Sequence, residues 1–419
     1  MNKISFLFPG QGSQYFGMGK KLCSQFKIAK SIFEEASDIL NIDLCKICFE
    51  DETNLLNKTE NAQIAIFTTS LAAYRVSSKV LGIKPCYMAG HSLGEITALV
   101  CANSIDFSQG LKIVKSRGKF MQDASSESSG MAAVIGVNKS VVEEVCNNCS
   151  EGDNFVIVSN YNAVQQTVIS GIKSAVNKAT EELERLGAKV VYLNVAAAFH
   201  SPLMQSAADK FKEELRKYEF KTPEYKVISN INALPYNNED DIPDKLSQLM
   251  ILPVRWYETM RYLENEGVEA ALEIGPKNVL TNLVNKNGYK FVAYAIDKDE
   301  DLKKIIDNNY LPKILNSEKN IIHLINLCLT TAVCTRNRNW DEDEYKKGVI
   351  KPYNSIKEIQ EQIESDNILP TYELAEKTLN MLKIILDTKK VPQEEVKNRI
   401  TKILTDSNTF ELFSKNELI

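Results

Sequence analysis

One serine of this 419-residue chain stands between two glycines in a Gly-x-Ser-x-Gly pattern. Gly90, Ser92 and Gly94 follow a short apolar run and precede a segment of helical composition. A strand that turns sharply into a helix exposes such a serine hydroxyl as a nucleophile, and the glycines avoid the crowding that a Cβ would cause in so tight a turn. The alternative is a plain turn without chemistry, because the pattern alone is only moderately specific.

A serine hydroxyl needs a base within hydrogen-bond reach, and the chain has 3 histidines from which to choose. His91 adjoins Ser92 and is expected to project elsewhere on the turn. His323 is flanked by aliphatic residues on a predicted helix, which favours a buried or half-buried histidine. His200 follows a run of small residues and precedes Pro202, and a loop position of this kind is typical of a general base. We therefore predict that Ser92 pairs with His200.

Arg117 lies in the middle of an apolar stripe on a predicted helix over residues 108–122. The stripe is formed by Ile113, Val114, Phe120 and Met121. An arginine on a core-facing line is costly unless an anion or fixed acceptors meet its guanidinium, which matches a carboxylate with two parallel hydrogen bonds. The helix therefore predicts either a binding site for a carboxylated ligand or a structural pair with an Asp or Glu.

Six segments in order along the chain carry a family resemblance. They are residues 8–14 (FPGQGSQ), 90–95 (GHSLGE), 116–122 (SRGKFMQ), 198–204 (AFHSPLM), 253–256 (PVRW) and 273–280 (EIGPKNVL). Together they resemble the malonyl-CoA:acyl-carrier-protein transacylases, which load malonyl units for fatty-acid synthesis. The resemblance extends over about the first 295 residues, and beyond about Asp297 no further motif matches.

The resemblance implies a two-step exchange through an acyl-enzyme. Ser92 takes the malonyl group from malonyl-CoA and passes it to the phosphopantetheine thiol of an acyl carrier protein, with His200 as base and acid. Backbone N–H groups of Leu93 and Gln11 are then the expected oxyanion donors. No cofactor of its own is implied, because malonyl-CoA is a substrate and phosphopantetheine belongs to the partner.

The same resemblance implies how the acyl group is chosen. Arg117 would bind the free carboxylate of malonyl. Phe199, directly before the predicted base, resembles the bulky residue of malonyl-selecting members, so malonyl is favoured over methylmalonyl. Met121, one turn beyond Arg117, is expected to line the pocket, although a plain core methionine would show the same pattern.

The sequence departs from the family at the group that orients the histidine. The family commonly uses a backbone carbonyl near a glutamine four residues before the proline of the Pro-Val-x-Trp segment. Leu249 occupies that place here, and Gln248 lies one residue earlier. If a main-chain oxygen orients His200, a leucine supplies it equally well, whereas a side-chain role would require Gln248 to shift by one residue.

Composition limits the other functions that the chain could have. Hydrophobic residues make up 44% and charged residues 25%, as in globular proteins, and the net charge of −5 argues against nucleic-acid binding. Two Cys-x-x-Cys pairs lie far apart without a nearby histidine, so we expect no metal and reduced thiols in the cytoplasm. No run of about 20 apolar residues is present to span a membrane. A locally basic surface for an acidic carrier protein, or a solvated helix face, would explain Lys112, Lys115 and Lys119.

The pattern along the chain predicts three regions of an α/β protein. Residues 1–125 and 197–296 alternate helices with apolar strands and predict an α/β-hydrolase-like core with a mainly parallel sheet. Residues 126–196 predict a ferredoxin-like subdomain of order β-α-β-β-α-β, whose body would lie beside the site, so the site should be a cleft between the two. Residues 297–419 predict a helical extension of unknown role.

Individual elements of these regions are also predicted. In the subdomain they are strands over 131–137, 155–159, 166–170 and 189–193 and helices over 140–146 and 172–186. The clearest helices of the extension cover 372–387 and 392–404. Its loop at residues 337–341 contains Trp340, which would serve either as a structural anchor or in a contact.

Three functions are compatible with these observations. The first is a malonyl transferase for fatty-acid synthesis. The second is a free-standing acyltransferase that loads a polyketide synthase, in which the extension contacts the synthase; a contact with a fatty-acid synthase is equally open. The third is an acyl-thioester hydrolase or a scaffold without activity. The oligomeric state and the identity of the carrier protein do not follow from the sequence.

Overall fold

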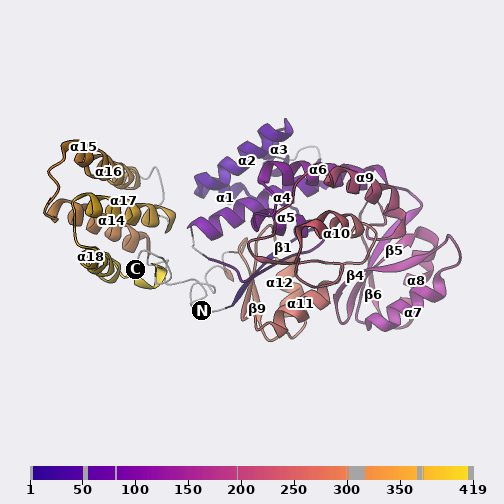
Figure 1. Ribbon diagram of the computed structural model, residues 1–419. Coiled ribbons are helices and arrows are strands. Elements are labelled where there is room, and N and C mark those ends of the chain that lie inside the picture. Colours follow the sequence, from indigo (N-terminus) through magenta and orange to yellow (C-terminus); the bar gives the residue numbers. More distant parts are fainter. Residues whose placement is uncertain are drawn as a thin grey trace. The chain divides into compact units, whose positions relative to one another are not determined.

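The computed structural model describes residues 3–50, 55–80, 83–195, 197–298, 300–301, 317–365, 370 and 372–413. The chain divides into two compact units (Figure 1). The first comprises Met1–Tyr74 and Pro85–Lys304, and the second comprises Arg75–Lys84 and Ile305–Ile419. The predicted α/β core and its insertion thus belong to one unit, and the helical extension forms most of the other.

A five-stranded parallel sheet organises the first unit, as the apolar strand pattern predicts. Its order is β7-β2-β1-β8-β9. The strands are β1 (Ile4–Phe8), β2 (Tyr87–Gly90), β7 (Lys226–Ile228), β8 (Ala270–Glu273) and β9 (Val292–Ala295). Every residue of β1, β2 and β8 is buried, because helices cover both faces of a parallel sheet (Figure 1).

Side chains on the two faces of β1 show how the helices pack against the sheet. Side chains alternate along a strand, so Leu7 belongs to the cluster built with Trp256 and Leu280, whereas Phe6 and Phe8 pack edge-on against the ring of Tyr74. Outside the insertion, the α-helices described in this unit are α1 (Lys20–Gln25), α2 (Lys27–Leu40), α3 (Leu44–Phe49), α4 (Thr59–Arg75), α5 (Leu93–Cys101), α6 (Phe107–Asp123), α9 (Gln205–Leu215), α10 (Ile242–Gln248), α11 (Trp256–Asn265) and α12 (Val279–Asn285).

The insertion has the predicted β-α-β-β-α-β order. Its antiparallel sheet has the strand order β4-β5-β3-β6, and both helices pack against it (Figure 1). The elements are β3 (Ser129–Ile135), α7 (Lys139–Cys149), β4 (Val156–Ala163), β5 (Gln166–Ile172), α8 (Lys173–Arg185) and β6 (Lys189–Tyr192). Backbone hydrogen bonds join β4 to the core, since Val254 N–H donates to Ser159 O and Val254 O accepts from Tyr161 N–H, both at 2.9 Å. Ala196, at the predicted end of the insertion, lies outside the described residues.

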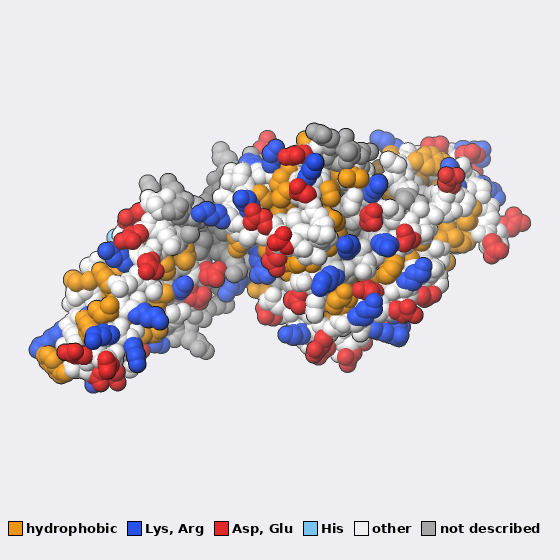
Figure 2. Space-filling model, turned by 90° about the horizontal axis from the view of Figure 1, so that it is seen from above, with side chains coloured by type: hydrophobic (Ala, Val, Ile, Leu, Met, Phe, Trp, Pro, Cys, Tyr) orange, Lys and Arg blue, Asp and Glu red, His pale blue; other side chains and the backbone are white. Residues whose placement is uncertain are grey.

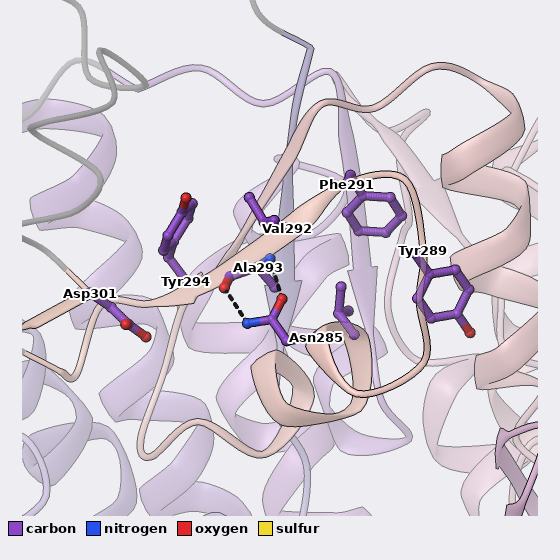
Figure 3. A pocket seen from close by; sticks show the side chains of 8 residues that line it. Asn285, Tyr289, Phe291, Val292, Ala293, Tyr294 and Asp301 are labelled. Carbon is purple, nitrogen blue, oxygen red and sulfur yellow. Dashed lines mark hydrogen bonds between the residues drawn. The ribbon is translucent and has the colours of Figure 1, made fainter.

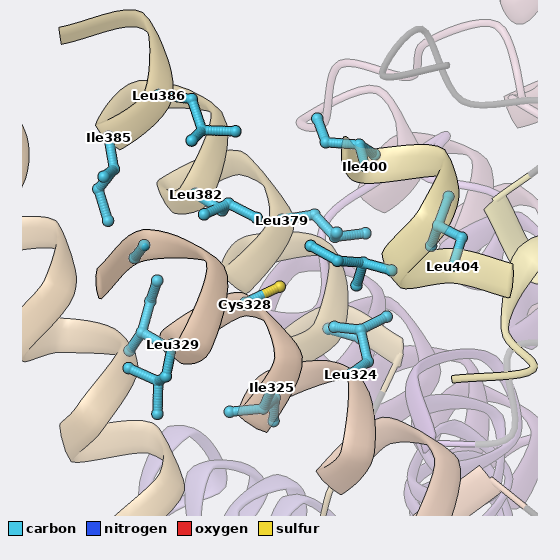
Figure 4. Close-up of a cluster of buried hydrophobic side chains, with 14 of the residues drawn as sticks. Leu324, Ile325, Cys328, Leu329, Leu379, Leu382, Ile385, Leu386, Ile400 and Leu404 are labelled. Carbon is cyan, nitrogen blue, oxygen red and sulfur yellow. The ribbon is translucent and has the colours of Figure 1, made fainter. Parts of the chain in front are cut away.

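The second unit is a helical assembly around an aliphatic core. Its longer helices are α14 (Ser317–Cys334), α16 (Lys351–Glu364), α17 (Tyr372–Thr388) and α18 (Gln393–Asp406), and its short ones are α15 (Glu342–Tyr345) and α19 (Phe410–Phe413). Figure 4 shows Leu324 and Cys328 of α14 facing Leu379 and Leu382 of α17, with Leu404 of α18 beside them. Helical spacing of apolar residues thus built a core here, as the periodicity predicted.

The prediction for His323 is wrong. This residue is exposed on α14. The buried positions of the helix include Ile321, Leu324, Ile325 and Cys328, and they follow the 3.6-residue period. His323 falls between them on the opposite side, so its aliphatic neighbours in sequence are not its neighbours in space.

Candidate active site

The nucleophile turn has the strained geometry that its glycines suggest. Strand β2 ends at Gly90, helix α5 begins at Leu93, and Ser92 between them has φ 53° and ψ −103°. A Cβ on Gly90 would lie 1.8 Å from the carbonyl carbon of Gly94, and one on Gly94 would lie 2.0 Å from Phe8 O. Only glycine fits at either position, and the tight packing holds Ser92 in a backbone conformation that costs of order 1–3 kcal/mol.

Ser92 and His200 meet although 108 positions separate them. Ser92 Oγ lies 2.8 Å from His200 Nε2, and His200 Nδ1 lies 2.5 Å from the carbonyl oxygen of Leu249. A carbonyl only accepts, so Nδ1 carries the proton and Nε2 is free to accept from the serine hydroxyl. Burial, and then the charge of Arg117, lower the pKa of His200 to about 3, so the imidazole is neutral at physiological pH.

The Leu249 carbonyl resolves the two alternatives for orienting the histidine. Gln248 is exposed at the end of α10, whereas the buried Leu249 directs its main-chain oxygen at His200. A backbone acceptor does not depend on side-chain identity, so the departure of the sequence from the family pattern leaves this hydrogen bond intact.

Arg117 points its guanidinium at the nucleophile. Its Nη2 donates to Ser92 Oγ at 2.9 Å and its Nη1 to Gln63 Oε1 at 2.8 Å, and the residue is 2% exposed. Burial lowers its pKa to about 10, and the buried carboxylate of Glu95 partly opposes this shift, so Arg117 stays protonated near neutral pH. Among the described residues its hydrogen-bond acceptors are these two neutral groups. The alternative of a direct structural pair with an acidic side chain is therefore not what the geometry shows.

The two expected oxyanion donors lie on either side of Ser92. Leu93 begins α5, and Gln11 belongs to the loop after β1, where a Cβ on Gly10 would lie 2.4 Å from His91 O. Within the described ranges, neither backbone N–H donates a hydrogen bond. The loop is fixed by Ser13 Oγ, which donates to Gly10 O at 2.7 Å. Both N–H groups are thus available to a ligand in the cavity that Gln11 and Leu93 line.

A cavity of about 530 Å³ contains all of these groups. Met121 and Phe199 line it, as the sequence predicted, and Met131, Asn160 and Asn162 reach it from the inserted subdomain. The site is therefore a cleft between core and insertion. Its remaining lining includes Gly10, Gly12, Gln14, His91, Ala133, Gln166, Val168, Leu193, Asn194, Val195, Val279, Leu280, Asn282, Leu283 and Lys286.

Sequence reasoning missed several polar residues that support the site. Gln63 is fully buried in an otherwise apolar stretch of α4, residues 62–67, and contacts Arg117, and its Nε2 lies 3.4 Å from Met121 Sδ. His91 Nε2 lies 2.9 Å from Asn162 Oδ1, and Asn230 bonds the backbone of the turn. A glutamine inside an apolar helical run is a signal that could have indicated Gln63, whereas the two asparagines carried none.

A second, smaller hollow of about 230 Å³ lies between α12 and β9. Figure 3 shows that the side-chain amide of Asn285 faces the backbone of Ala293, with which it makes two hydrogen bonds of 2.9 Å. Tyr289, Phe291 and Asp301 are among the other lining residues, and no serine, cysteine or histidine is among them. The hollow therefore offers no nucleophile and base, unlike the larger cavity.

A serine, a neutral histidine, backbone N–H donors and a buried arginine in one cleft are groups that an acyltransferase uses. Residues 5–306 match the model of the acyl transferase domain. The chain belongs to this acyl transferase family.

Named relatives agree with this assignment. A malonyl CoA-acyl carrier protein transacylase of Escherichia coli (strain K12) is 40% identical over 300 residues, which are 71% of this chain and 97% of the relative. A protein of the same name from Bacillus subtilis is 39% identical over 400 residues, 94% of this chain and 98% of the relative. A match of this length extends beyond residue 297, where the sequence motifs end, so the helical extension has a counterpart in that relative.

Solved structures show the same fold. The malonyl CoA-acyl carrier protein transacylase of Clostridium perfringens has a TM-score of 0.70 at 35% identity and covers 75% of this chain and 99% of its own. A malonyl-transacylase in complex with a type II PKS acyl-carrier protein, PlMCAT:AntF, has a TM-score of 0.70 at 36% identity and covers 73% of this chain and 100% of its own. No helix among the described residues is long and apolar enough to cross a membrane.

Proposed function

We propose that this protein transfers malonyl from malonyl-CoA to the phosphopantetheine thiol of an acyl carrier protein, through a malonyl ester on Ser92. The observation that carries the proposal is the buried guanidinium of Arg117, 2.9 Å from Ser92 Oγ and hydrogen-bonded only to neutral groups among the described residues. A fixed cation of this kind beside a nucleophile selects an acyl group that carries its own carboxylate.

In the first step Ser92 Oγ attacks the thioester carbonyl while its proton moves to His200 Nε2. The N–H groups of Leu93 and Gln11 would stabilise the tetrahedral oxyanion. Its collapse breaks the carbon–sulfur bond, and the leaving thiolate of coenzyme A takes the proton from His200. The products are malonyl-Ser92 and free coenzyme A.

In the second step the phosphopantetheine thiol gives its proton to His200 and attacks the ester carbonyl of malonyl-Ser92. The carbon–oxygen bond breaks, and Ser92 Oγ recovers the proton from the imidazole. Exclusion of water from the cleft decides whether transfer or hydrolysis follows, since both begin from the same ester.

Binding of malonyl would also activate the site. Arg117 Nη2 donates to the oxygen of Ser92, and its charge is the second cause of the low pKa of His200. A carboxylate paired with Arg117 would draw the guanidinium away from Ser92 and neutralise that charge. His200 then becomes a stronger base when the correct acyl group is bound.

The residues around Arg117 would set the size of the acyl group. Phe199 is buried beside His200 and would crowd a methyl branch on the malonyl α-carbon, so we propose malonyl in preference to methylmalonyl. Met121 lies one helical turn from Arg117 and provides an adaptable wall. No metal or resident cofactor has a part in this chemistry.

The proposal is tested by mixing the protein, malonyl-CoA and a holo acyl carrier protein and measuring the masses of both proteins. We expect the carrier to gain a malonyl group and Ser92 to carry it transiently. Release of free malonate without a mass gain on the carrier would instead identify a thioester hydrolase. We propose fatty-acid synthesis in the cytoplasm as the pathway.

Charged side chains of both signs are mixed on the surface of the protein. Figure 2 shows Lys and Arg side chains interspersed with Asp and Glu on the face that it presents. Lys112, Lys115 and Lys119 are exposed along α6, the helix that also carries Arg117. We propose that these three lysines contribute to the contact with an acidic carrier.

The helical extension favours a second pathway, in which the same chemistry loads a polyketide synthase. Bacillus subtilis relatives occur in two lengths: one matches 400 residues of this chain, and one from strain 168 matches 308 residues, 97% of its own length. Two lengths within one species are consistent with different carrier partners for the longer form. We propose that the extension contacts the synthase that bears the carrier.

Trp340 is the residue of the extension best suited to such a contact. It is 90% exposed, which excludes the anchoring role that its loop also allowed. The loop is hydrogen-bonded to its surroundings, since Asn339 Nδ2 donates to Glu344 Oε2 at 2.8 Å and Arg338 N–H to Lys389 O at 3.1 Å. An exposed tryptophan beside arginines is typical of interface hot spots.

The contact is tested in the full-length protein with Trp340→Ala and, as a control, Ile384→Ala, which alters another exposed apolar residue. We expect Trp340→Ala to raise the KM for a carrier that is part of its synthase, with no change for an isolated carrier or in malonyl-Ser92 formation. Equal kinetics of the two variants with both carriers would contradict the contact.

A further inference from the structure

Asn230 is a fully buried residue whose polar groups all meet the active-site framework. Its side-chain Oδ1 accepts from Ser92 N–H at 2.7 Å, and its Nδ2 donates to Gly90 O at 2.7 Å. Its backbone N–H donates to Glu95 Oε2 at 2.8 Å, and its carbonyl accepts from Arg255 N–H at 2.9 Å. Such complete use of a buried amide indicates a site built to hold one geometry.

The side chain of Asn230 makes the hydrogen bonds that a neighbouring strand would otherwise make. Strands β7 and β2 pair in parallel up to Ile228 opposite Ala89. Beyond this point β7 ends, whereas β2 continues to Gly90 beside β1, so the groups of Gly90 and Ser92 on the β7 side would lack a strand partner. A side-chain amide offers an acceptor and a donor, as a peptide group does. Asn230 accepts from Ser92 N–H and donates to Gly90 O, the residues after and before His91 in the sequence.

Asn230 also joins the nucleophile to the segment that orients the base. Arg255 N–H binds its carbonyl, and the same segment carries Leu249, whose oxygen accepts from His200. On the other side Glu95 of α5 binds the Asn230 N–H, and Tyr236 O–H donates to the second oxygen of that carboxylate. The nucleophile turn, through the side chain, and α5 and the segment that meets His200, through the backbone, thus all join at Asn230.

We infer that Asn230 is the positioning residue that keeps Ser92 in its strained, reactive conformation, with Oγ directed at His200. The inference rests on Ser92 being the nucleophile of the proposed function. Because Asn230 consumes the Ser92 N–H, the oxyanion must be met by the next N–H along α5, that of Leu93, and by Gln11. Asn230 touches neither the acyl group nor its carboxylate, so its loss should affect kcat rather than KM.

The experiment compares Asn230→Ala with the parent protein by rapid quench and intact mass, which follow malonyl-Ser92 formation. We expect a rate lower by roughly 100-fold, as for a misplacement of about 1 Å, and a KM for malonyl-CoA within threefold of the parent value. Asn232→Ala is the matched control, since among the described residues Asn232 Oδ1 accepts from Leu234 N–H alone, within its own turn. A rate within threefold of the parent for Asn230→Ala would overturn the inference.

Asn230→Asp supplies a second readout that mere loss of folding would not produce, and it carries the test if Asn230→Ala does not fold. An ionised Asp keeps the acceptor for Ser92 but turns an oxygen toward Gly90 O, whereas a protonated Asp donates to that oxygen. The rate relative to the parent should therefore recover at least threefold between pH 8 and pH 6. Glu95 from α5 and Tyr236 after β7 face this position in both proteins, so the ratio isolates residue 230. A deficit that does not change with pH would contradict the role of the amide donor.

A fluorophosphonate that labels activated serines separates this inference from the proposed function. If the parent protein reacts with the reagent but forms no malonyl-Ser92, the proposed malonyl transfer is wrong. The labelling rates of the Asn230 variants then still decide whether the residue positions Ser92, with the same 100-fold criterion.

Discussion

The active-site cleft and the helical C-terminal unit bury side chains of opposite kinds. The active site and the residues that support it bury Arg117, His200, Glu95 and Asn230 within hydrogen-bonded networks, whereas the helical unit buries mainly aliphatic residues around Leu379 and Leu382. Burial of polar groups costs free energy unless each finds a partner. The active-site region therefore contributes less to folding stability than an aliphatic core would, but it holds reactive groups in a fixed geometry. Aliphatic packing has no such requirement and tolerates changes of shape more readily.

Replacement of the cation in the cleft should have the largest effect. We expect Arg117→Ala to lower malonyl transfer by about 10²- to 10³-fold, the range for removing one member of a buried ion pair, while acetyl transfer from acetyl-CoA changes little. Initial rates with the two thioesters measure the difference. Arg117→Lys keeps the charge but lacks the planar guanidinium. Its rate of malonyl transfer should lie between those of the parent and Arg117→Ala. Equal losses for malonyl and acetyl would assign Arg117 a structural role.

A cavity in the helical unit should weaken that unit without touching the chemistry. Leu379→Ala removes a fully buried side chain of α17 and should cost about 2–5 kcal/mol, visible as faster hydrogen exchange of the α14 and α17 amides. Malonyl-Ser92 formation from malonyl-CoA should remain within twofold. Ile384→Ala, on the exposed side of the same helix, should leave exchange unchanged. A parallel loss of Ser92 acylation would show that the two regions are coupled.

Glu95, a buried carboxylate near the active site, should make the free energy of unfolding depend on pH in a defined direction. Burial raises the pKa of Glu95 from 4.5 to about 7. A raised folded-state pKa contributes stability that is present below pH 4.5 and is lost as pH rises through about 7, by up to about 3 kcal/mol. Glu95→Gln should remove this loss. The pKa shift of His200 acts in the opposite direction, because its lowered pKa contributes stability only above pH 6.5. His200 is present in both proteins, so its contribution cancels when the two are compared.

The measurement uses urea unfolding between pH 5 and pH 8 in a Trp340→Phe background. Trp256, buried in the first unit, is then the single tryptophan and reports that unit alone. If the unfolding free energies of the parent and the Glu95→Gln variant change equally over this pH range, Glu95 is ionised throughout it.

The smallest effect is expected outside the network. Gln248 is exposed, and the Leu249 carbonyl orients His200, so Gln248→Ala should retain malonyl transfer within about threefold of the parent rate. Steady-state loading of a carrier protein measures it. A loss comparable to that of Ser92→Ala would mean that the glutamine side chain takes part after all.

Periodicity and motif spacing predicted much of this molecule. The parallel sheet, the β-α-β-β-α-β insertion and the helices of the extension followed from apolar repeats, which report local burial directly. The repeat was less reliable for single residues, as the exposed His323 shows, because a position one step off a helical stripe points away from the core. The residues that support the site, Gln63 and Asn230, gave weak or no local signal because their partners are distant in sequence.

The sequence by itself determined which reactive groups the chain possesses: a serine between two glycines, a loop histidine and an arginine on an apolar helix face. Their local conformations depend on nearby residues, so they could be recognised there. Tertiary structure alone decided that the carbonyl of Leu249 rather than the side chain of Gln248 meets His200, that Arg117 meets neutral partners, and that Asn230 bonds the backbone of Ser92. Hydrogen bonds between segments over a hundred residues apart are set by the packing of the sheet and helices, which no local pattern encodes.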